Sequence, residues 1–541
     1  MKDISSTGSF INFYLNNYIY VDKTQYIRDL IKLERVFISR PRRFGKSLTL
    51  DTIATLFETG VEPYFKGTWI YDKWTEPTYP VLRLNFLDLD KYSLEHFKQK
   101  LNAIISSFAR DINVKNYEEK VEPEDTIYFL LDELRKEKRQ IVILIDEYDC
   151  QMTANINNET LYKQFQEKIK SFYATIKNKW PIKFLGITGV TRLKDVEIFS
   201  IGSDINDITN DSAYSQMIGF TRDEIKKYYI DYLKLASSYE NSCSVDNVTD
   251  EQIESLLDRL AKNYDGYCFD EDYENKVFST WSVNTFLQSV VDKKKVQFGE
   301  YWYDNGGLPS ILVNYLKTHE LNIFEYLDKD KFLKVSSDDF KNPTALTTIN
   351  QNVLMCQTGY LTLRSDLNKT STVALGIPNG EIYKALNRLL ANNIFKGNTD
   401  ITDDYGRSLL EVGTVDDIIN LFNSALNSVS YDNYPIVSES SVQNMLKLYL
   451  LGAHQKVLSE VHEAKGRADL VVNTDNRRIV FEFKYAKNET EAKSKLLDAV
   501  EQIKTRDYGN ILPKKNELIR IAAVFNADPK VRAFTENQIV P

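Results

Sequence analysis

The chain has 541 residues and a net charge of −9, with 43% hydrophobic and 27% charged residues, the balance of an ordinary soluble protein. The negative charge argues against a generally cationic nucleic-acid binder, although a nuclease can confine its basic side chains to one cleft. Four cysteines without metal-ligand spacing argue against a disulfide framework, and no apolar run reaches the ~18–20 residues that span a bilayer. We therefore expect several domains, no membrane contact and a reducing cytoplasm.

The first predicted domain, residues 1–225, alternates short apolar runs with longer segments of helical spacing. Runs rich in Val, Ile, Leu or Phe predict buried strands of a largely parallel sheet at residues 36–39, 81–86, 141–145 and 182–187. Helices are predicted between them at residues 47–58, 94–110, 126–135 and 161–177. Strands that alternate with helices in this way are typical of a doubly wound α/β domain.

A phosphate-binding loop is predicted at residues 40–47, between the first strand and the first helix. Backbone N–H groups at a helix N-terminus bind phosphate, and the predicted nucleotide contacts are Arg42, Arg43, Phe44, Gly45, Lys46 and Ser47. Lys46 would reach the β- and γ-phosphates, and the Ser47 hydroxyl would bind Mg²⁺. Arg40 stands where the usual pattern has glycine, and a positive φ costs Arg more than Gly, so we expect the loop entry to differ from the usual turn.

Two acidic residues, Asp146 and Glu147, follow the third predicted strand. Asp146 would hold Mg²⁺ through water, and Glu147 would orient or deprotonate the attacking water. Thr188, at the end of the next strand, is the candidate sensor of the γ-phosphate. Arg192 could stabilise the transition state, in cis or across a subunit boundary of a homo-oligomer, and its alternative is a surface ion pair. The loop and the acidic pair together predict ATP binding and hydrolysis.

Residues 226–430 are predicted to form a mostly helical middle region. Helical spacing dominates at residues 223–235, 250–263, 284–291 and 414–429. Two aromatic segments, residues 263–267 and 301–303, interrupt it. Such side chains can stack on bases, but aromatic groups in a helical region more often pack its core, and we expect packing.

The last predicted domain, residues 431–541, has the order helix, three strands, helix, strand, at residues 441–451, 456–461, 468–472, 478–483, 489–505 and 518–525. This order suits a small α/β domain. Its second and third strands pair as a hairpin, with Asp469 on one and Glu482 and Lys484 on the other. Because side chains alternate along a strand, Glu482 and Lys484 share one face, while Phe481 and Phe483 point the other way.

Two carboxylates beside a lysine suit a metal-dependent nuclease. Asp469 and Glu482 would hold one or two divalent ions, which activate water and stabilise charge on the scissile phosphate. Lys484 would position the water or neutralise the developing charge. The alternative is the exposed face of a hairpin with an ordinary Glu–Lys arrangement. Glu439 and Gln443 on the preceding helix could each add a metal contact, and the sequence does not choose between them.

These motifs together resemble a known family, the AAA-ATPase-like proteins whose C-terminus is a PD-(D/E)XK nuclease-superfamily domain. The resemblance extends over nearly the whole chain, and its matching segments are residues 20–24, 40–47, 144–149, 187–190, 207–209, 219–221, 264–267, 358–361, 377–379, 466–470 and 482–484. The segment at residues 40–47 is specific and makes the missing first glycine a family trait. The resemblance implies an ATPase core and a restriction-endonuclease-like domain with metal ligands Asp469 and Glu482 and a catalytic Lys484.

We therefore predict a protein that uses ATP and Mg²⁺ and cleaves nucleic acid, with DNA favoured as the substrate. ATP at Lys46 and Ser47 would rearrange the middle region and so control access to the C-terminal site. One alternative is a nucleotide-switched regulatory protein whose nuclease-like domain grips nucleic acid or a partner without cutting. Another is a signalling NTPase that senses a partner protein and involves no nucleic acid.

Overall fold

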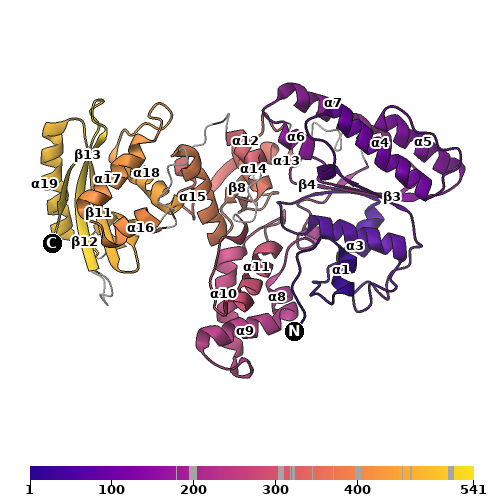
Figure 1. The fold of residues 1–541 in the computed structure, drawn as a ribbon, viewed down its shortest axis with the longest axis horizontal. Helices are drawn as coiled ribbons and strands as arrows, with labels where there is room; N and C mark the ends of the chain where they lie inside the picture. Colours follow the sequence, from indigo (N-terminus) through magenta and orange to yellow (C-terminus); the bar gives the residue numbers. More distant parts are fainter. Residues whose placement is uncertain are drawn as a thin grey trace. The chain divides into compact units, whose positions relative to one another are not determined.

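The structure, a computed structural model, describes residues 1–177, 179–193, 204–302, 310–316, 319, 323–343, 345–369, 371–395, 404–453, 455–463, 466–509 and 517–541. The chain divides into two compact units, Met1–His319 with Phe332–Ile382, and Glu320–Lys331 with Tyr383–Pro541. The fold class is α/β, as predicted. A parallel sheet forms near the N-terminus, the middle is mostly helical, and a small mixed sheet forms near the C-terminus (Figure 1).

The N-terminal sheet is parallel and buried. Its strands are β1 (Arg35–Ser39), β2 (Val81–Asn85), β3 (Ile141–Asp146), β4 (Ile182–Gly189) and β5 (Asn206–Asp207). They lie in the order β2-β3-β4-β1-β5, and every neighbouring pair is parallel. Because both faces are covered, β1, β3 and β4 consist almost entirely of buried residues. The four predicted strands are confirmed, and β4 lies between β1 and β3.

Helices cover both faces of this sheet (Figure 1). On one side lie α1 (Phe10–Leu15) and α3 (Lys46–Thr59), and on the other lie α4 (Leu94–Asp111), α5 (Pro123–Lys136), α6 (Cys150–Ala154) and α7 (Glu159–Ile176). A short helix, α2 (Thr24–Leu30), precedes β1. The four predicted helices are confirmed. The helix α5 begins earlier than predicted, because Pro123 suits a first helical turn, where no backbone N–H is needed.

The middle of the chain is mostly helical, as predicted. Its helices are α8 (Arg222–Tyr228), α9 (Ile230–Asn241), α10 (Asp250–Tyr264), α11 (Thr280–Lys293), α12 (Ser310–Leu316), α13 (Ser337–Lys341), α14 (Gln351–Thr358), α15 (Gly380–Ile394), α16 (Asp404–Val412) and α17 (Val415–Asn427). The single helix predicted at residues 223–235 is wrong, because the backbone of Tyr229, at φ −112° and ψ 20°, separates α8 from α9. The small sheet β6-β8-β7 is absent from the prediction, since β6 (Leu333–Ser336), β7 (Thr362–Leu363) and β8 (Thr372–Gly376) are too short for a clear alternating pattern.

The aromatic segments of the middle region pack in its interior, as expected. Tyr264, Tyr267 and Trp302 are all buried. Between the two tyrosines, Gly266 has a φ of 92°, and a Cβ atom there would lie 2.3 Å from the carbonyl oxygen of Pro378. Glycine is therefore required at this position for two reasons: the backbone is left-handed, and another chain segment approaches too closely for a side chain.

The second unit contains the C-terminal sheet. Besides α16, α17 and most of α15, this unit contains α18 (Glu439–Gly452), β9 (Lys456–Glu463), β10 (Gly466–Asn473), β11 (Arg477–Ala486), α19 (Glu489–Arg506), β12 (Glu517–Asn526) and β13 (Ala533–Ile539). The order is β13-β12-β11-β10-β9, in which only β11 and β12 are parallel among the described strands. The predicted hairpin of β10 and β11 is confirmed. The strand β13 is absent from the prediction because its sequence is mostly polar.

The alternation predicted for β11 is also confirmed. Val480 packs in a cluster with Ala499 and Ile503 of α19, on one face of the sheet. Phe481 faces the opposite way, and its ring lies 5.4 Å from that of Phe422 in α17. One face of β11 thus packs against α19, and Phe422 of α17 packs against the other.

The four cysteines are free thiols, in line with the expectation that they form no disulfide framework. Among the described residues, none of the helices combines the length and the apolar character that a membrane crossing requires.

Gly266→Ala is expected to lower the Tm of the first unit by at least about 4 °C, because the added methyl group meets the Pro378 carbonyl and the left-handed backbone disfavours alanine. Gly60→Ala is the matched control. Gly60 also has a positive φ, 71°, but nothing lies within 4 Å of a Cβ atom there, so this variant carries only the backbone cost. Calorimetry of both variants measures the difference, and equal shifts would contradict the role of the close approach.

Candidate functional site

The phosphate loop connects β1 to α3. Of its residues, Arg43 and Gly45 have positive φ angles, 71° and 107°, whereas Arg40 does not. The Arg40 side chain is buried, and its Nη1 donates to the carbonyl oxygens of Ser39 at 2.9 Å and Thr209 at 2.6 Å. Arginine is therefore compatible with the first loop position, because the left-handed conformations fall on later residues.

Lys46 lies at the end of the loop and turns its side chain back toward it. Its Nζ donates to the carbonyl oxygens of Arg40 at 3.1 Å and Pro41 at 3.3 Å, and lies 3.5 Å from Glu147 Oε1. The side chain is only 4% exposed. Two carbonyls and one carboxylate thus satisfy the ammonium group, and phosphate oxygens can replace all three as acceptors.

Asp146 joins the loop to the neighbouring strands. Its Oδ2 accepts a hydrogen bond from the Ser47 hydroxyl at 2.5 Å, and its Oδ1 accepts one from the Thr188 hydroxyl at 2.5 Å. The structure therefore brings together three of the predicted site residues. Glu147 follows with a left-handed backbone, φ 52°, and its carboxylate lies beside Lys46.

Arg192 belongs to a different group of side chains. Its guanidinium forms an ion pair with Asp207 of β5, and its backbone N–H donates to Gln357 Oε1 at 3.3 Å. The ion pair is the alternative that the sequence leaves open. A contribution of Arg192 to the transition state stays a prediction.

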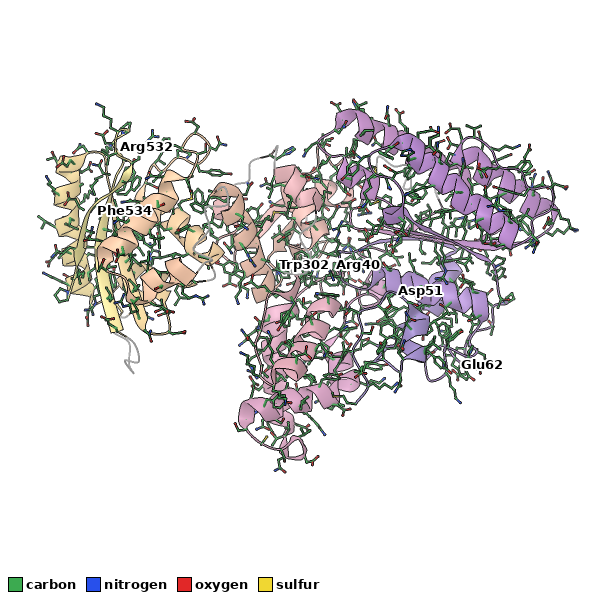
Figure 2. All side chains as sticks on the ribbon, in the orientation of Figure 1. Arg40, Asp51, Glu62, Trp302, Arg532 and Phe534 are labelled. Atoms are coloured by element: carbon green, nitrogen blue, oxygen red, sulfur yellow. The ribbon has the colours of Figure 1, made fainter. Side chains whose placement is uncertain are left out.

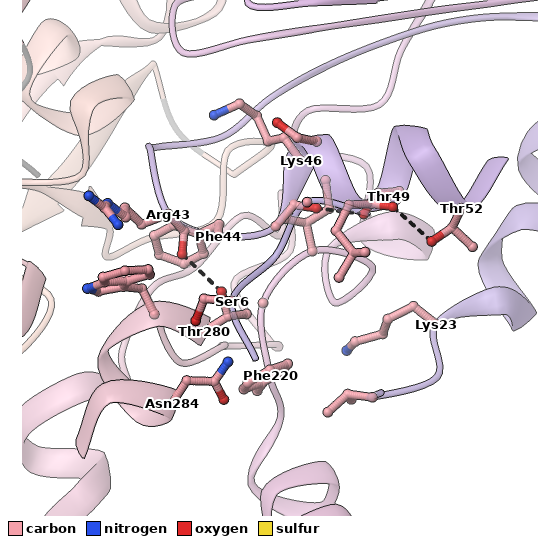
Figure 3. Close-up of a pocket in the computed structure, with 18 of the residues that line it drawn as sticks. Ser6, Lys23, Arg43, Phe44, Lys46, Thr49, Thr52, Phe220, Thr280 and Asn284 are labelled. Atoms are coloured by element: carbon pink, nitrogen blue, oxygen red, sulfur yellow. Dashed lines mark hydrogen bonds between the residues drawn. The ribbon is translucent and has the colours of Figure 1, made fainter. Parts of the chain in front are cut away.

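A cavity of about 360 Å³ adjoins the phosphate loop (Figure 3). The loop forms one wall, and the others come from residues 5–8, from Ile19 to Lys23, from Met217 to Phe220 and from the start of α11. Sequence reasoning does not assign the walls beyond the loop to the site. Two of these walls overlap segments that resemble the known family, residues 20–24 and 219–221. Neither segment has a residue type that by itself points to nucleotide binding.

Side chains of the middle region contact the phosphate loop directly. The Thr280 hydroxyl donates to the Arg43 carbonyl oxygen at 2.9 Å, and the Arg43 guanidinium lies 3.8 Å from the centre of the Trp281 ring. Phe44 packs edge-on against Tyr267 at 4.7 Å. These contacts fix the loop residues that the sequence predicts to surround phosphate.

A second support runs through a buried carboxyl group. The Trp302 indole N–H donates to the Arg42 carbonyl oxygen at 3.4 Å, and Trp302, labelled in Figure 2, is fully buried. Glu381 accepts hydrogen bonds from the Trp302 backbone N–H at 2.8 Å and the Ser282 hydroxyl at 2.7 Å. Burial raises the pKa of Glu381 to about 8, against these two hydrogen bonds. Sequence reasoning misses both residues, because neither Trp nor Glu stands in a nucleotide-binding motif.

The second predicted site lies at the hairpin of β10 and β11. One oxygen each of Glu439, Asp469 and Glu482 lies within 4.8 Å of the others. Lys484 Nζ donates to Glu482 Oε1 at 2.7 Å and to Glu439 Oε1 at 3.2 Å. The structure therefore brings Asp469, Glu482 and Lys484 together, and the shared face of Glu482 and Lys484 is confirmed.

The start of α18 resolves a choice that the sequence leaves open. Glu439 contributes its carboxylate to the cluster, whereas the Gln443 amide donates to the backbone carbonyl oxygen of Asp469. Asp469 Oδ2 also accepts the backbone N–H of Phe483 at 2.8 Å. Gln443 thus holds β10 in place, and Glu439 joins the carboxylates.

The electrostatics of this cluster favour a bound cation. Burial raises the pKa of Asp469, and burial together with the charge of Asp469 raises the pKa of Glu482 to about 7. Burial disfavours the charged form of Lys484, but its hydrogen bond to Glu482 and the nearby carboxylates raise its pKa overall. Glu482 Oε2 is buried and has no hydrogen-bond partner among the described residues. Crowded carboxylates with one unused, buried oxygen fit a divalent metal ion, for which oxygen is the preferred ligand.

Comparisons with known proteins identify two domains in the chain. Residues 5–199 match a family model described as "Predicted AAA-ATPase", and residues 437–535 match one described as "PD-(D/E)XK nuclease superfamily". The chain thus carries an AAA-ATPase-like domain and a nuclease-superfamily domain, as the resemblance implies. A protein of Azotobacter chroococcum mcd 1, described as "Uncharacterized protein in vnfD 5'region", is 26% identical over 533 residues, which cover 95% of this chain and 94% of the relative.

Two solved structures have a weak likeness to the chain. The crystal structure of Cdc6p from Pyrobaculum aerophilum has 11% identity and a TM-score of 0.23, covering 68% of this chain and 93% of its own. The structure of the Aeropyrum pernix ORC1 protein in complex with DNA has 10% identity and a TM-score of 0.25, covering 71% and 97%. At these TM-scores, neither supports a statement about this chain.

Glu381→Gln is expected to gain stability relative to the wild type as the pH rises from about 5 to about 8. The folded state holds the Glu381 proton up to about pH 8, whereas the unfolded state releases it near its ordinary value. Folding therefore takes up a proton between these values, and wild-type stability falls as the pH rises through them. Glutamine has no such proton and keeps an oxygen for the Trp302 N–H. Melting curves over this pH range test the shift, with Glu167→Gln on the exposed face of α7 as the control.

Proposed function

We propose that this protein binds and hydrolyses ATP at its phosphate loop and cleaves nucleic acid, with DNA favoured, at its C-terminal carboxylate cluster. The observation that carries the nuclease activity is the convergence of Glu439, Asp469 and Glu482 beside Lys484. The ATPase activity is supported by the contact between Ser47, at the start of α3, and Asp146, at the end of β3. The proposed setting is the cytoplasm.

The cavity beside the loop would hold the base and the ribose of ATP. Its volume of about 360 Å³ lies within the usual range for small-molecule sites, and apolar side chains such as Ile19, Met217 and Phe220 line it. Lys46 would exchange the carbonyl oxygens of the loop for the β- and γ-phosphate oxygens. The phosphates, which carry the charge of ATP, would lie at the basic loop. The base and the ribose are uncharged, so they need no charged residue in the rest of the cavity.

The residues around Asp146 would carry out the hydrolysis. Ser47 and Asp146 fit a magnesium ion, because a hydroxyl and a carboxylate oxygen already meet there. Such an ion neutralises charge on the β- and γ-phosphates. Glu147 would orient or deprotonate the attacking water, and Thr188 would sense the γ-phosphate. Arg192 would stabilise the transition state, in cis or, in a homo-oligomer, on the nucleotide of a neighbouring subunit.

The C-terminal cluster would hold one or two divalent ions through Asp469 and Glu482, with Glu439 as a further ligand. Such an ion lowers the pKa of a bound water and stabilises negative charge on a phosphate. Lys484, held between Glu482 and Glu439, would position that water or neutralise charge as the phosphodiester bond breaks. The Gln443 amide would keep Asp469 in register with Glu482.

The nucleotide would act as a control on the nuclease. The helix α15 begins in the first unit, and its residues from Tyr383 onward belong to the second, so it is one covalent path between the two activities. The alternative is a regulatory protein whose nuclease-like domain binds nucleic acid without cutting. Wild-type protein that binds DNA and hydrolyses ATP but never cleaves, with Mg²⁺ or Mn²⁺ and on single- or double-stranded substrates, would identify that alternative.

Lys46→Ala is expected to lower ATP hydrolysis by at least about 100-fold and to weaken ATP binding, because the phosphates lose their buried cation. Lys100→Ala, in the exposed part of α4, is the matched control and should leave both unchanged. Phosphate release and binding of a fluorescent ATP analogue measure the two effects. If Lys46→Ala bound the ATP analogue as tightly as the wild type does, the nucleotide site would have to lie elsewhere.

Glu482→Gln and Lys484→Ala are expected to abolish metal-dependent cleavage for different reasons. Glu482→Gln removes a metal ligand and should weaken Mn²⁺ binding by at least about 10-fold, whereas Lys484→Ala removes the lysine and leaves the three carboxylates. Titration of the full-length chain with Mn²⁺, followed by electron paramagnetic resonance, separates the two variants without an activity assay. Lys487→Ala, an exposed lysine after β11, is the control. Cleavage that persists in Lys484→Ala would exclude this site as the catalyst.

A further inference from the structure

The guanidinium of Arg40 is a buried cation with unmet hydrogen bonds. The residue is 1% exposed, and Nη1 is the atom that donates to Ser39 and Thr209. Nε and Nη2 are buried and have no hydrogen-bond partner among the described residues. The ring of Phe269 lies 4.2 Å from the guanidinium carbon. A buried charged donor without a partner is costly, so these two N–H groups call for an acceptor.

The carboxylate near Arg40 is already engaged. Asp207 acts on the charge of Arg40, but its Oδ2 forms the ion pair with Arg192, and its Oδ1 accepts the backbone N–H of Thr209 at 3.0 Å. Two guanidinium groups thus share one carboxylate. Burial lowers the pKa of Arg40 to about 9, which is the mark of a cation whose charge is poorly balanced. Asp207 therefore accepts no hydrogen bond from Nε or Nη2 of Arg40.

A small cavity lies next to these groups. Its volume is about 40 Å³, and both arginines line it together with Thr209, Asn210, Cys268 and Cys356. None of the described residues that line it is acidic. Burial raises the pKa of Cys268 to about 11 and that of Cys356 to about 12, so both are neutral thiols that supply no negative charge. A space that holds one water needs roughly 10–15 Å³, so there is room here for a small ion.

We propose that this cavity binds a small monovalent inorganic anion, with chloride as the probe, between Arg40 and Arg192. The anion accepts hydrogen bonds from Nε and Nη2 of Arg40 and lies beside the positive charge of this buried guanidinium. The site lies directly behind the phosphate loop, because the carbonyl oxygens of Arg40 and Pro41 are those that hold Lys46. Arg40, which replaces the usual first glycine, would thus anchor the loop through a bound anion.

The test uses the full-length chain without nucleotide, so that its outcome is independent of the proposed ATPase and nuclease activities. Thermal melting is followed while sodium gluconate is replaced by sodium chloride at a constant ionic strength of about 0.15 M. An anion that binds the folded state raises the Tm with concentration and then levels off, and we expect a rise of roughly 2–5 °C for the first unit. Water as the occupant predicts the same Tm in both salts, which would overturn the proposal.

Cys356→Met places a larger apolar side chain at the wall of the cavity and leaves both arginines intact. This variant should keep its fold in gluconate and lose the chloride-dependent rise in Tm. Cys243→Met, at a half-buried cysteine away from the cavity, is the matched control and should keep the rise. A full chloride effect in Cys356→Met would place the anion elsewhere and overturn the proposal.

A direct measurement remains decisive if either variant fails to fold. Crystals of the wild-type chain grown or soaked in bromide should have an anomalous-scattering peak within hydrogen-bonding distance of Arg40 Nε or Nη2. A well-ordered cavity without such a peak, filled by water alone, would overturn the proposal even where the Tm responds to chloride.

Discussion

Asp146 accepts hydrogen bonds from hydroxyl groups on two sides, and the nucleotide site depends on this arrangement. Ser47 approaches from the start of α3 and Thr188 from the end of β4. Both can reach Asp146 because β4 lies between β1 and β3, so that three consecutive strands of a parallel sheet end at one edge. Lys46 and Glu147 meet at the same edge, where the Lys46 ammonium lies 3.5 Å from the Glu147 carboxylate.

The phosphate loop is also shaped by chain segments that bind no phosphate. Trp302 and Thr280 hold its carbonyl groups, and Phe44 packs among buried aromatic rings. Trp302 and Thr280 thus bind carbonyl oxygens of the loop, not its N–H groups. Arg40 also supports the loop, because its guanidinium donates hydrogen bonds to Ser39 at the end of β1 and to Thr209 after β5. The loop sequence contains a single glycine, and the buried side chains around the loop hold its conformation.

The C-terminal cluster has the opposite physical character. Glu439, Asp469 and Glu482 lie close enough to repel one another, and burial adds to the cost of their charges. Lys484 offsets part of this repulsion, yet one oxygen of Glu482 is left without a partner. Packing of Val480 and Phe481 on opposite faces of β11 holds the cluster together despite the repulsion. A bound cation would relieve this repulsion between the carboxylates, which the contacts within the cluster offset only in part.

Local patterns were enough to determine much of this protein. Apolar runs and helical spacing identified most strands of both sheets and the long helices that cover them, but not β5 or β13. Motif spacing pointed to Lys46, Asp146, Glu482 and Lys484, because each signal lies within a few consecutive residues. Only the tertiary structure decided that Glu439 joins the carboxylates while Gln443 holds the backbone, and that Glu381 and Trp302 support the loop. These contacts join segments that are tens to hundreds of residues apart in the sequence, so their geometry depends on packing that no local pattern encodes.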